Sequence, residues 1–115
     1  MNLVNNSEGV HDNLGWAYID NNEFEESIKS FDRCLSLQGN HLDAIIGISV
    51  AYYSCNRLDL AKKYFENAKT IEPLLNDRNK GILSLEQRGY FYSENQKKII
   101  RKMYKDLNVY DGDKK

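Results

Sequence analysis

The sequence offers little that would attract a membrane or nucleic acid. Its 115 residues carry a formal net charge of −1, which gives no general attraction to polyanions or anionic lipid. No apolar run approaches the roughly 18 residues of a membrane span. Met1 is followed by a polar, Asn-rich stretch, and not by the apolar segment of a signal peptide. We therefore expect a cytoplasmic protein without a membrane span, for which nucleic acid is a poor candidate partner.

The sequence also lacks the patterns of an enzyme or a metal protein. Its two cysteines, Cys34 and Cys55, have neither CxxC nor metal-ligand spacing, and we expect reduced, structural thiols. His11 and His41 have no acid or thiol at a recognisable spacing, and both are predicted to be surface or helix-capping residues. No glycine-rich phosphate loop, nucleophile elbow or HExxH motif is present. The sequence thus predicts no catalytic residues, no cofactor and no metal.

One pattern occurs twice in this sequence. When the chain is displaced by about 34 residues, residues 8–41 and 42–75 fall into register. The matching positions include Leu14 and Ile48, Tyr18 and Tyr52, Asn22 and Asn56, Ser27 and Ala61, Phe31 and Phe65, and Leu37 and Ile71. Each copy has two segments of helical apolar spacing. The asparagine between them tolerates the left-handed backbone that closes a helix.

Six helices are expected along the chain. Those of the two copies span residues 8–20, 24–37, 42–54 and 58–71. Pro73, the only proline, stops the fourth, since proline cannot continue a helix. A fifth helix is expected over residues 75–88, ended by Gly89, and a sixth over residues 93–107, capped by Ser93.

The sixth helix has two chemically different sides. Its apolar side carries Ile99, Ile100, Met103 and Leu107, and its other side carries Lys97, Lys98, Arg101, Lys102 and Lys105. We expect a single domain over residues 1–107, in which residues 76–107 form a degenerate capping pair of helices. Asn6 or Ser7 suits the cap of the first helix, and residues 108–115 are expected to be a frayed tail.

The two copies resemble the tetratricopeptide repeat, whose signature is W-x-x-L-G-x-x-Y, then A-x-x-x-F, then P. The first copy reads His11-x-x-Leu14-Gly15-x-x-Tyr18, then Ser27-x-x-x-Phe31; the second reads Ile45-x-x-Ile48-Ser49-x-x-Tyr52, then Ala61-x-x-x-Phe65, then Pro73. The resemblance covers residues 8–74. It implies an all-α, right-handed solenoid of helical hairpins.

The resemblance also implies a binding surface for a partner protein or peptide. In this family the first helix of each pair lines a concave groove that receives a peptide or helix. The predicted groove residues are Asp12, Trp16, Ile19, Asp43, Ile46, Val50, Tyr53, Lys80, Gln87 and Arg88. An accessible Trp16 would act as an aromatic anchor for a partner. The alternative for Trp16 is packing on its own neighbouring helix.

Three further alternatives remain open at this stage. Two repeats are fewer than the three that an independent array usually needs, so the chain is also expected to form a homodimer or one segment of a longer solenoid. The sixth helix is expected to be the polar-faced cap that a repeat array requires, packed on the fifth helix. Its basic side could instead bind an acidic surface.

Overall fold

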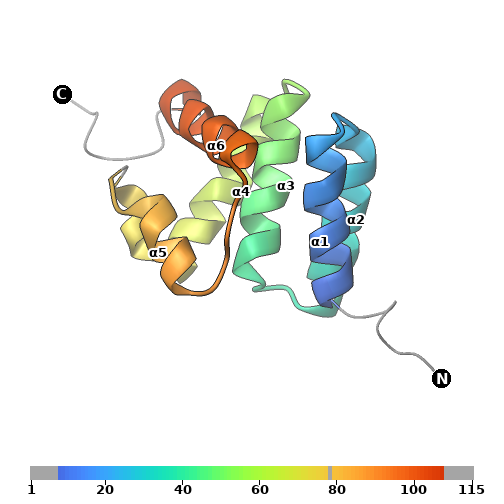
Figure 1. The fold of residues 1–115 in the computed structure, drawn as a ribbon, viewed down its shortest axis with the longest axis horizontal. Helices are drawn as coiled ribbons and strands as arrows, with labels where there is room; N and C mark the ends of the chain where they lie inside the picture. The colour runs from blue at the N-terminus through green and yellow to red at the C-terminus, as the bar shows by residue number, and fades with distance from the viewer. Residues whose placement is uncertain (1–7, 78, 108–115) are drawn as a thin grey trace.

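The computed structural model describes residues 8–77 and 79–107, and every regular element in that part of the chain is helical (Figure 1). The elements are α1 (Glu8–Asp20), α2 (Phe24–Leu37), α3 (Leu42–Ser54), α4 (Leu58–Ile71), the 3₁₀ turn η2 (Pro73–Asn76), α5 (Gly81–Gln87) and α6 (Glu94–Leu107). Among the described residues, no helix is long and apolar enough to cross a bilayer. The predicted all-α hairpin solenoid is confirmed.

The two predicted hairpins, α1–α2 and α3–α4, close in the same way. Asn22 and Asn56 adopt φ angles of 63° and 66°, the left-handed conformation that asparagine tolerates. The chain then turns back, and the backbone N–H groups of Glu23 and Arg57 each donate to a tyrosine carbonyl at 2.8 Å. The four helix ranges expected from the repeat are therefore confirmed.

Small residues let the first three helices approach closely around Phe31. A methyl group built on Gly15 of α1 would lie 2.5 Å from the Phe31 ring, and one on Gly47 of α3 would lie 2.2 Å from it. Neither distance is possible for a real side chain, so both positions need glycine while the ring stays in place. Phe31 and its counterpart Phe65 are fully buried, as predicted, and Tyr18 and Tyr52 are half-buried.

Three leucines that belong to the apolar pattern of the helices are partly exposed. Leu14 is 43% exposed, Leu37 is 53% exposed and Leu58 is 41% exposed. Leu14 lies on α1, in the hairpin at the end of the stack (Figure 1), and the other two lie at helix ends. The apolar periodicity identified the helices correctly, but it could not show which flanks lack a neighbour.

The prediction of one helix over residues 75–88 is wrong. The chain forms η2, then a turn, and α5 begins at Gly81. The Asp77 carboxylate accepts the backbone N–H of Asn79 at 2.8 Å and of Lys80 at 3.2 Å. Such a local side-chain turn competes with helix formation. Gly89, with φ of 97°, ends α5 as expected.

Helix α6 begins as predicted, but it packs elsewhere. Ser93 Oγ accepts the N–H of Gln96 at 3.0 Å, and the Gln96 side chain accepts the N–H of Ser93 at 2.9 Å, which is a reciprocal capping box. The helix lies across α3 (Figure 1) and not mainly against α5. Ile100, Met103 and Leu107 are buried there. The cap expected at Asn6 or Ser7 lies outside the described residues, as does the 108–115 tail.

Candidate partner-binding face

The predicted groove residues of α1 and α3 do come together on one face. Trp16 of α1 donates its indole N–H to Asp43 Oδ2 of α3 at 3.0 Å, and this buried hydrogen bond joins the two hairpins. Asp12, Ile19, Ile46 and Val50 are buried beside them on the same two helices. We call this surface the α1–α3 face.

The chain itself covers this face. Residues 90–107, here called the covering segment, run past α3 as the extended loop and the final helix seen in Figure 1. Trp16 is 6% exposed, and its ring packs on those of Tyr92 and Phe31, with ring centroids 5.1 Å and 5.7 Å apart. The expectation of an accessible tryptophan is therefore wrong, and Trp16 packs on its neighbours.

Polar contacts hold the covering segment at both ends of α6. At the start of the helix, Asn95 Nδ2 and Gln96 Nε2 donate to the Asp20 carboxylate at 3.1 and 3.0 Å. Near its end, the half-buried Tyr53 donates its hydroxyl to Asp106. Before the helix, Tyr92 donates its hydroxyl to Asp43. Tyr92 is the contact that sequence reasoning missed, and its only signal was the aromatic run of residues 90–92.

Burial strongly perturbs two titratable groups on this face, Asp12 and Tyr92. Desolvation, reinforced by a hydrogen bond to Asp43 and by its charge, holds the pKa of Asp12 well above its ordinary value. Desolvation and the Asp43 charge likewise raise the pKa of Tyr92. The α1–α3 face thus places two carboxyl groups side by side in a poorly solvated site.

The three predicted residues near α5 do not join this face in the same way. Lys80 and Gln87 are exposed. Arg88 turns toward α4: its Nε donates to Glu72 Oε1 at 2.8 Å, and its terminal nitrogen donates to the Ile71 carbonyl at 3.3 Å. Arg88 therefore ties α5 to the end of α4.

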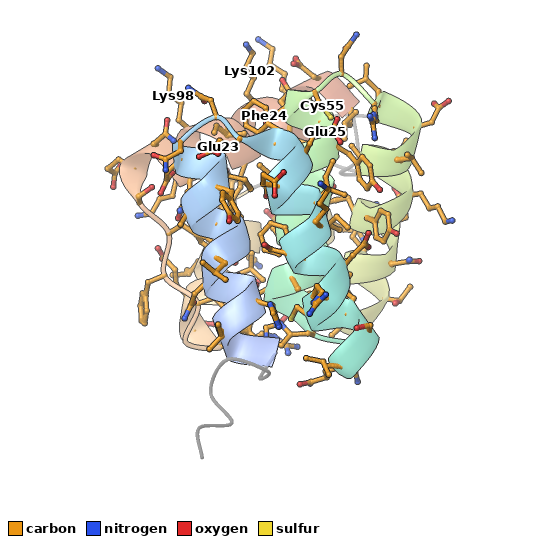
Figure 2. All side chains as sticks on the ribbon, turned by 90° about the vertical axis from the view of Figure 1, so that its right-hand side faces the viewer. Glu23, Phe24, Glu25, Cys55, Lys98 and Lys102 are labelled. Carbon is orange, nitrogen blue, oxygen red and sulfur yellow. The ribbon has the colours of Figure 1, made fainter. Side chains whose placement is uncertain are left out.

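An open cleft of about 690 Å³ remains at one rim of the face. Phe24, Leu58 and Ile99 give it apolar walls, and Lys98 and Lys102 of α6 stand over it. Figure 2 shows both lysines projecting at the same end of the molecule as Phe24. The expected basic side of α6 is thus largely solvent-facing, except that Lys97 pairs with Glu86 at 3.4 Å.

Comparison with known proteins agrees with this architecture. A 60-residue stretch is 28% identical to Superkiller protein 3 of Saccharomyces cerevisiae, covering 52% of this chain and 4% of that protein. Residues 9–41 and 42–73 each match a tetratricopeptide repeat, and together they make up more than half of the chain. Such repeats generally mediate protein–protein interactions and are not catalytic. The chain belongs to the tetratricopeptide repeat family.

Proposed function

We propose that this protein binds a partner protein on the α1–α3 face and that a partner's amphipathic helix replaces α6 there. One observation carries the proposal: the face already holds an amphipathic helix, that of its own chain. Helix-in-groove binding relies on apolar side chains at helical spacing. Ile100, Met103, Tyr104 and Leu107 of α6 have this spacing and are all buried.

The contacts of α6 define the chemistry a partner would need. Its helix must present apolar side chains on one face at successive turns, because the face beneath is lined by buried aliphatic and aromatic groups. A donor that reaches the exposed carboxylate of Asp20, where Asn95 and Gln96 now donate, would add to the binding. A partner without such a donor would leave Asp20 to water, at little cost.

Replacement of α6 lowers the apparent affinity for any partner. A site that is open in only a fraction of molecules binds with an affinity reduced by that fraction. Loosening α6 should therefore strengthen partner binding. Because Trp16 is buried, the variants that test this must leave Trp16 in place.

The test uses a fluorescent synthetic peptide of residues 92–107 and the full-length chain. The double variant Asp20→Ala, Tyr53→Phe removes three hydrogen bonds that hold α6, and should bind the peptide roughly tenfold more tightly than the wild type. Fluorescence anisotropy measures binding. Emission from Trp16, the only tryptophan, reports whether the covering segment has moved. Glu23→Ala, which removes an exposed carboxylate near the same turn, is the matched control and should bind as wild type does.

Two results would overturn the proposal. One is a double variant in which amide hydrogens of residues 94–107 exchange faster while the peptide still does not bind. The other is equal binding of a peptide carrying Met103→Lys, because a charge should not be accepted at a buried position. A concentration-dependent dimer in sedimentation would show instead that α6 is exchanged between copies of this chain.

We also propose a reducing, cytoplasmic location. Neither Cys34 nor Cys55 forms a disulfide in the described part of the chain, and cytosolic proteins seldom contain disulfides.

A further inference from the structure

Three side chains that can bind metals meet where α1, α2 and the start of α3 converge. They are Asp12 of α1, Cys34 of α2 and His41, the N-cap residue of α3. Their ligand atoms all lie within 4.8 Å of one another. Each residue comes from a different element, so the folded chain brings together groups that no sequence motif connects.

One oxygen atom of these groups lacks a hydrogen-bond partner. Asp12 is only 6% exposed, and its Oδ1 atom has no hydrogen-bond partner among the described residues. Buried polar atoms in native proteins are nearly always hydrogen-bonded or bound to an ion or water. The unsatisfied oxygen of Asp12 therefore points to a ligand.

Asp43 is placed to support Asp12. The two oxygens of Asp43 already accept hydrogen bonds from Trp16 and Tyr92, so Asp43 is held in place beside the Asp12 carboxyl. The negative charge of Asp43, next to the site, favours a cation there.

An opening leads from solvent to two of the three residues, Asp12 and His41. A cleft of about 450 Å³ lies between α1, the start of α3 and the covering segment, and Asp12, His41 and Asp43 line it together with Tyr90. Cys34 is fully buried. An ion would enter through the cleft, and a water molecule in the cleft could complete its coordination.

We propose that Asp12, Cys34 and His41 bind a divalent transition-metal ion of the zinc type. A carboxylate oxygen, a thiolate sulfur and an imidazole nitrogen are all zinc ligands, with bonds of about 2.0–2.3 Å. Hard cations such as Mg²⁺ and Ca²⁺ prefer oxygen ligands only. With these bond lengths and tetrahedral angles, ligand atoms around one zinc ion are about 3.3–3.6 Å apart, so the three side chains would close around the ion by about 1 Å. This proposal departs from the sequence-based expectation of no metal.

Metal binding would change the start of α3. His41 Nδ1 now accepts the backbone N–H of Ala44 at 3.3 Å, a long bond. If the ion binds Nδ1, it replaces this bond; if it binds Nε2, Nδ1 must carry the proton and can no longer accept. Either way the ion replaces the helix cap as the group that fixes His41, and it links three helices of the solenoid.

The test titrates the full-length, reduced protein with Zn²⁺ and with Co²⁺. Calorimetry should show one ion per chain, with a buffer-dependent heat because a thiol that binds the ion releases its proton. Zn²⁺ should raise the thermal midpoint as its concentration exceeds Kd. The Co²⁺ complex should show the near-ultraviolet thiolate-to-metal charge-transfer band that reports sulfur ligation.

Matched variants assign the site. Cys34→Ser should abolish the charge-transfer band and weaken Zn²⁺ binding at least tenfold, whereas Cys55→Ser, which changes the other cysteine, should leave both unchanged. Asp12→Asn keeps the size of the side chain and should also weaken binding at least tenfold, so it decides the matter if Cys34→Ser does not fold. Absence of saturable one-to-one binding would overturn the proposal. So would a band that persists in Cys34→Ser and is lost in Cys55→Ser.

Discussion

The two hairpins have the same local geometry but different surroundings. Leu14 of α1 and Ile48 of α3 occupy the same position of the repeat, yet Leu14 is 43% exposed and Ile48 is fully buried. Helix α1 has a helical hairpin on one side only, whereas α3 lies between α1–α2, α4 and α6 (Figure 1). The position of a helix in the stack, and not its place in the repeat, therefore determines how much each apolar side chain is buried and how much it contributes to stability.

In each hairpin a serine hydroxyl forms a hydrogen bond where the two helices approach closely. The serine stands on the second helix of the first hairpin and on the first helix of the second hairpin. In the first hairpin Ser27 of α2 donates to the carbonyl of Gly15 at 2.9 Å. In the second, Ser49 of α3 donates to the carbonyl of Ala61 at 2.6 Å. Gly15 matches Ser49 in the repeat, and Ser27 matches Ala61. The contact is the same although its donor has moved to the other helix.

The two buried phenylalanines obtain their aromatic partners from different places. Phe31 meets Trp16 edge to face, with ring centroids 5.7 Å apart. In the second repeat Val50 stands where Trp16 stands in the first, and Phe65 instead meets Tyr104 of α6 at 4.9 Å. Helix α6 thus supplies the aromatic partner for the phenylalanine of the second hairpin, whereas the first hairpin contains its own.

The largest effect is expected from removing these rings. Phe31→Ala and Phe65→Ala should each lower the free energy of unfolding by about 3–5 kcal/mol, the range for a buried phenylalanine. Urea denaturation measures the loss. If the two hairpins are equivalent, the losses should be similar. Unchanged stability in both variants would contradict the stacking of the two hairpins.

Two substitutions at equivalent repeat positions, one in each hairpin, should lower stability by unequal amounts, and they test how position in the stack matters. Ile48→Ala should cost about 2–5 kcal/mol, because it leaves a cavity in the core. Leu14→Ala should cost less than about 1 kcal/mol, because much of the side chain is already in water. Thermal or urea unfolding of the two variants gives the comparison. Equal losses would show that α1 is covered in solution, as it would be in a dimer or a longer solenoid.

A further, small effect concerns the ends of α2 and α4, where the first repeat has Gln38 and the second has Glu72. The hydrogen bond from Arg88 holds the pKa of Glu72 below its ordinary value of 4.5. This contribution to stability is full above pH 4.5 and is lost as the pH falls through the lowered pKa. Glu72→Gln, which copies the first repeat, should cost about 1 kcal/mol at neutral pH, since Arg88 is partly exposed.

Unfolding measured between pH 7 and pH 3 checks this sign. The wild type should lose its advantage over Glu72→Gln as the pH falls below 4.5, and the two curves should meet in acid. Glu66→Gln, which removes an exposed carboxylate of α4, serves as the control and should change stability by less than about 0.5 kcal/mol. A gap that persists in acid would show that Glu72 acts through packing and not through its charge.

The same division between local and long-range effects explains what could be predicted for the site. The repeat pattern correctly placed Trp16 and Asp43 on facing helices, because helical spacing is a local property. It could not show that Tyr92, 49 residues away from Asp43, would donate to it. It gave no sign that Asp12, Cys34 and His41 meet, because no fixed spacing connects residues from three separate helices.

The sequence by itself determined the four helices of the two repeats, their closing asparagines and the membership of a repeat family, because these depend on residues a few positions apart. The tertiary structure alone decided that α6 folds back onto α3 and buries Trp16. Packing of this kind depends on which apolar surfaces stay uncovered after the hairpins have stacked. Here α6, which lies far along the chain, covers one of them.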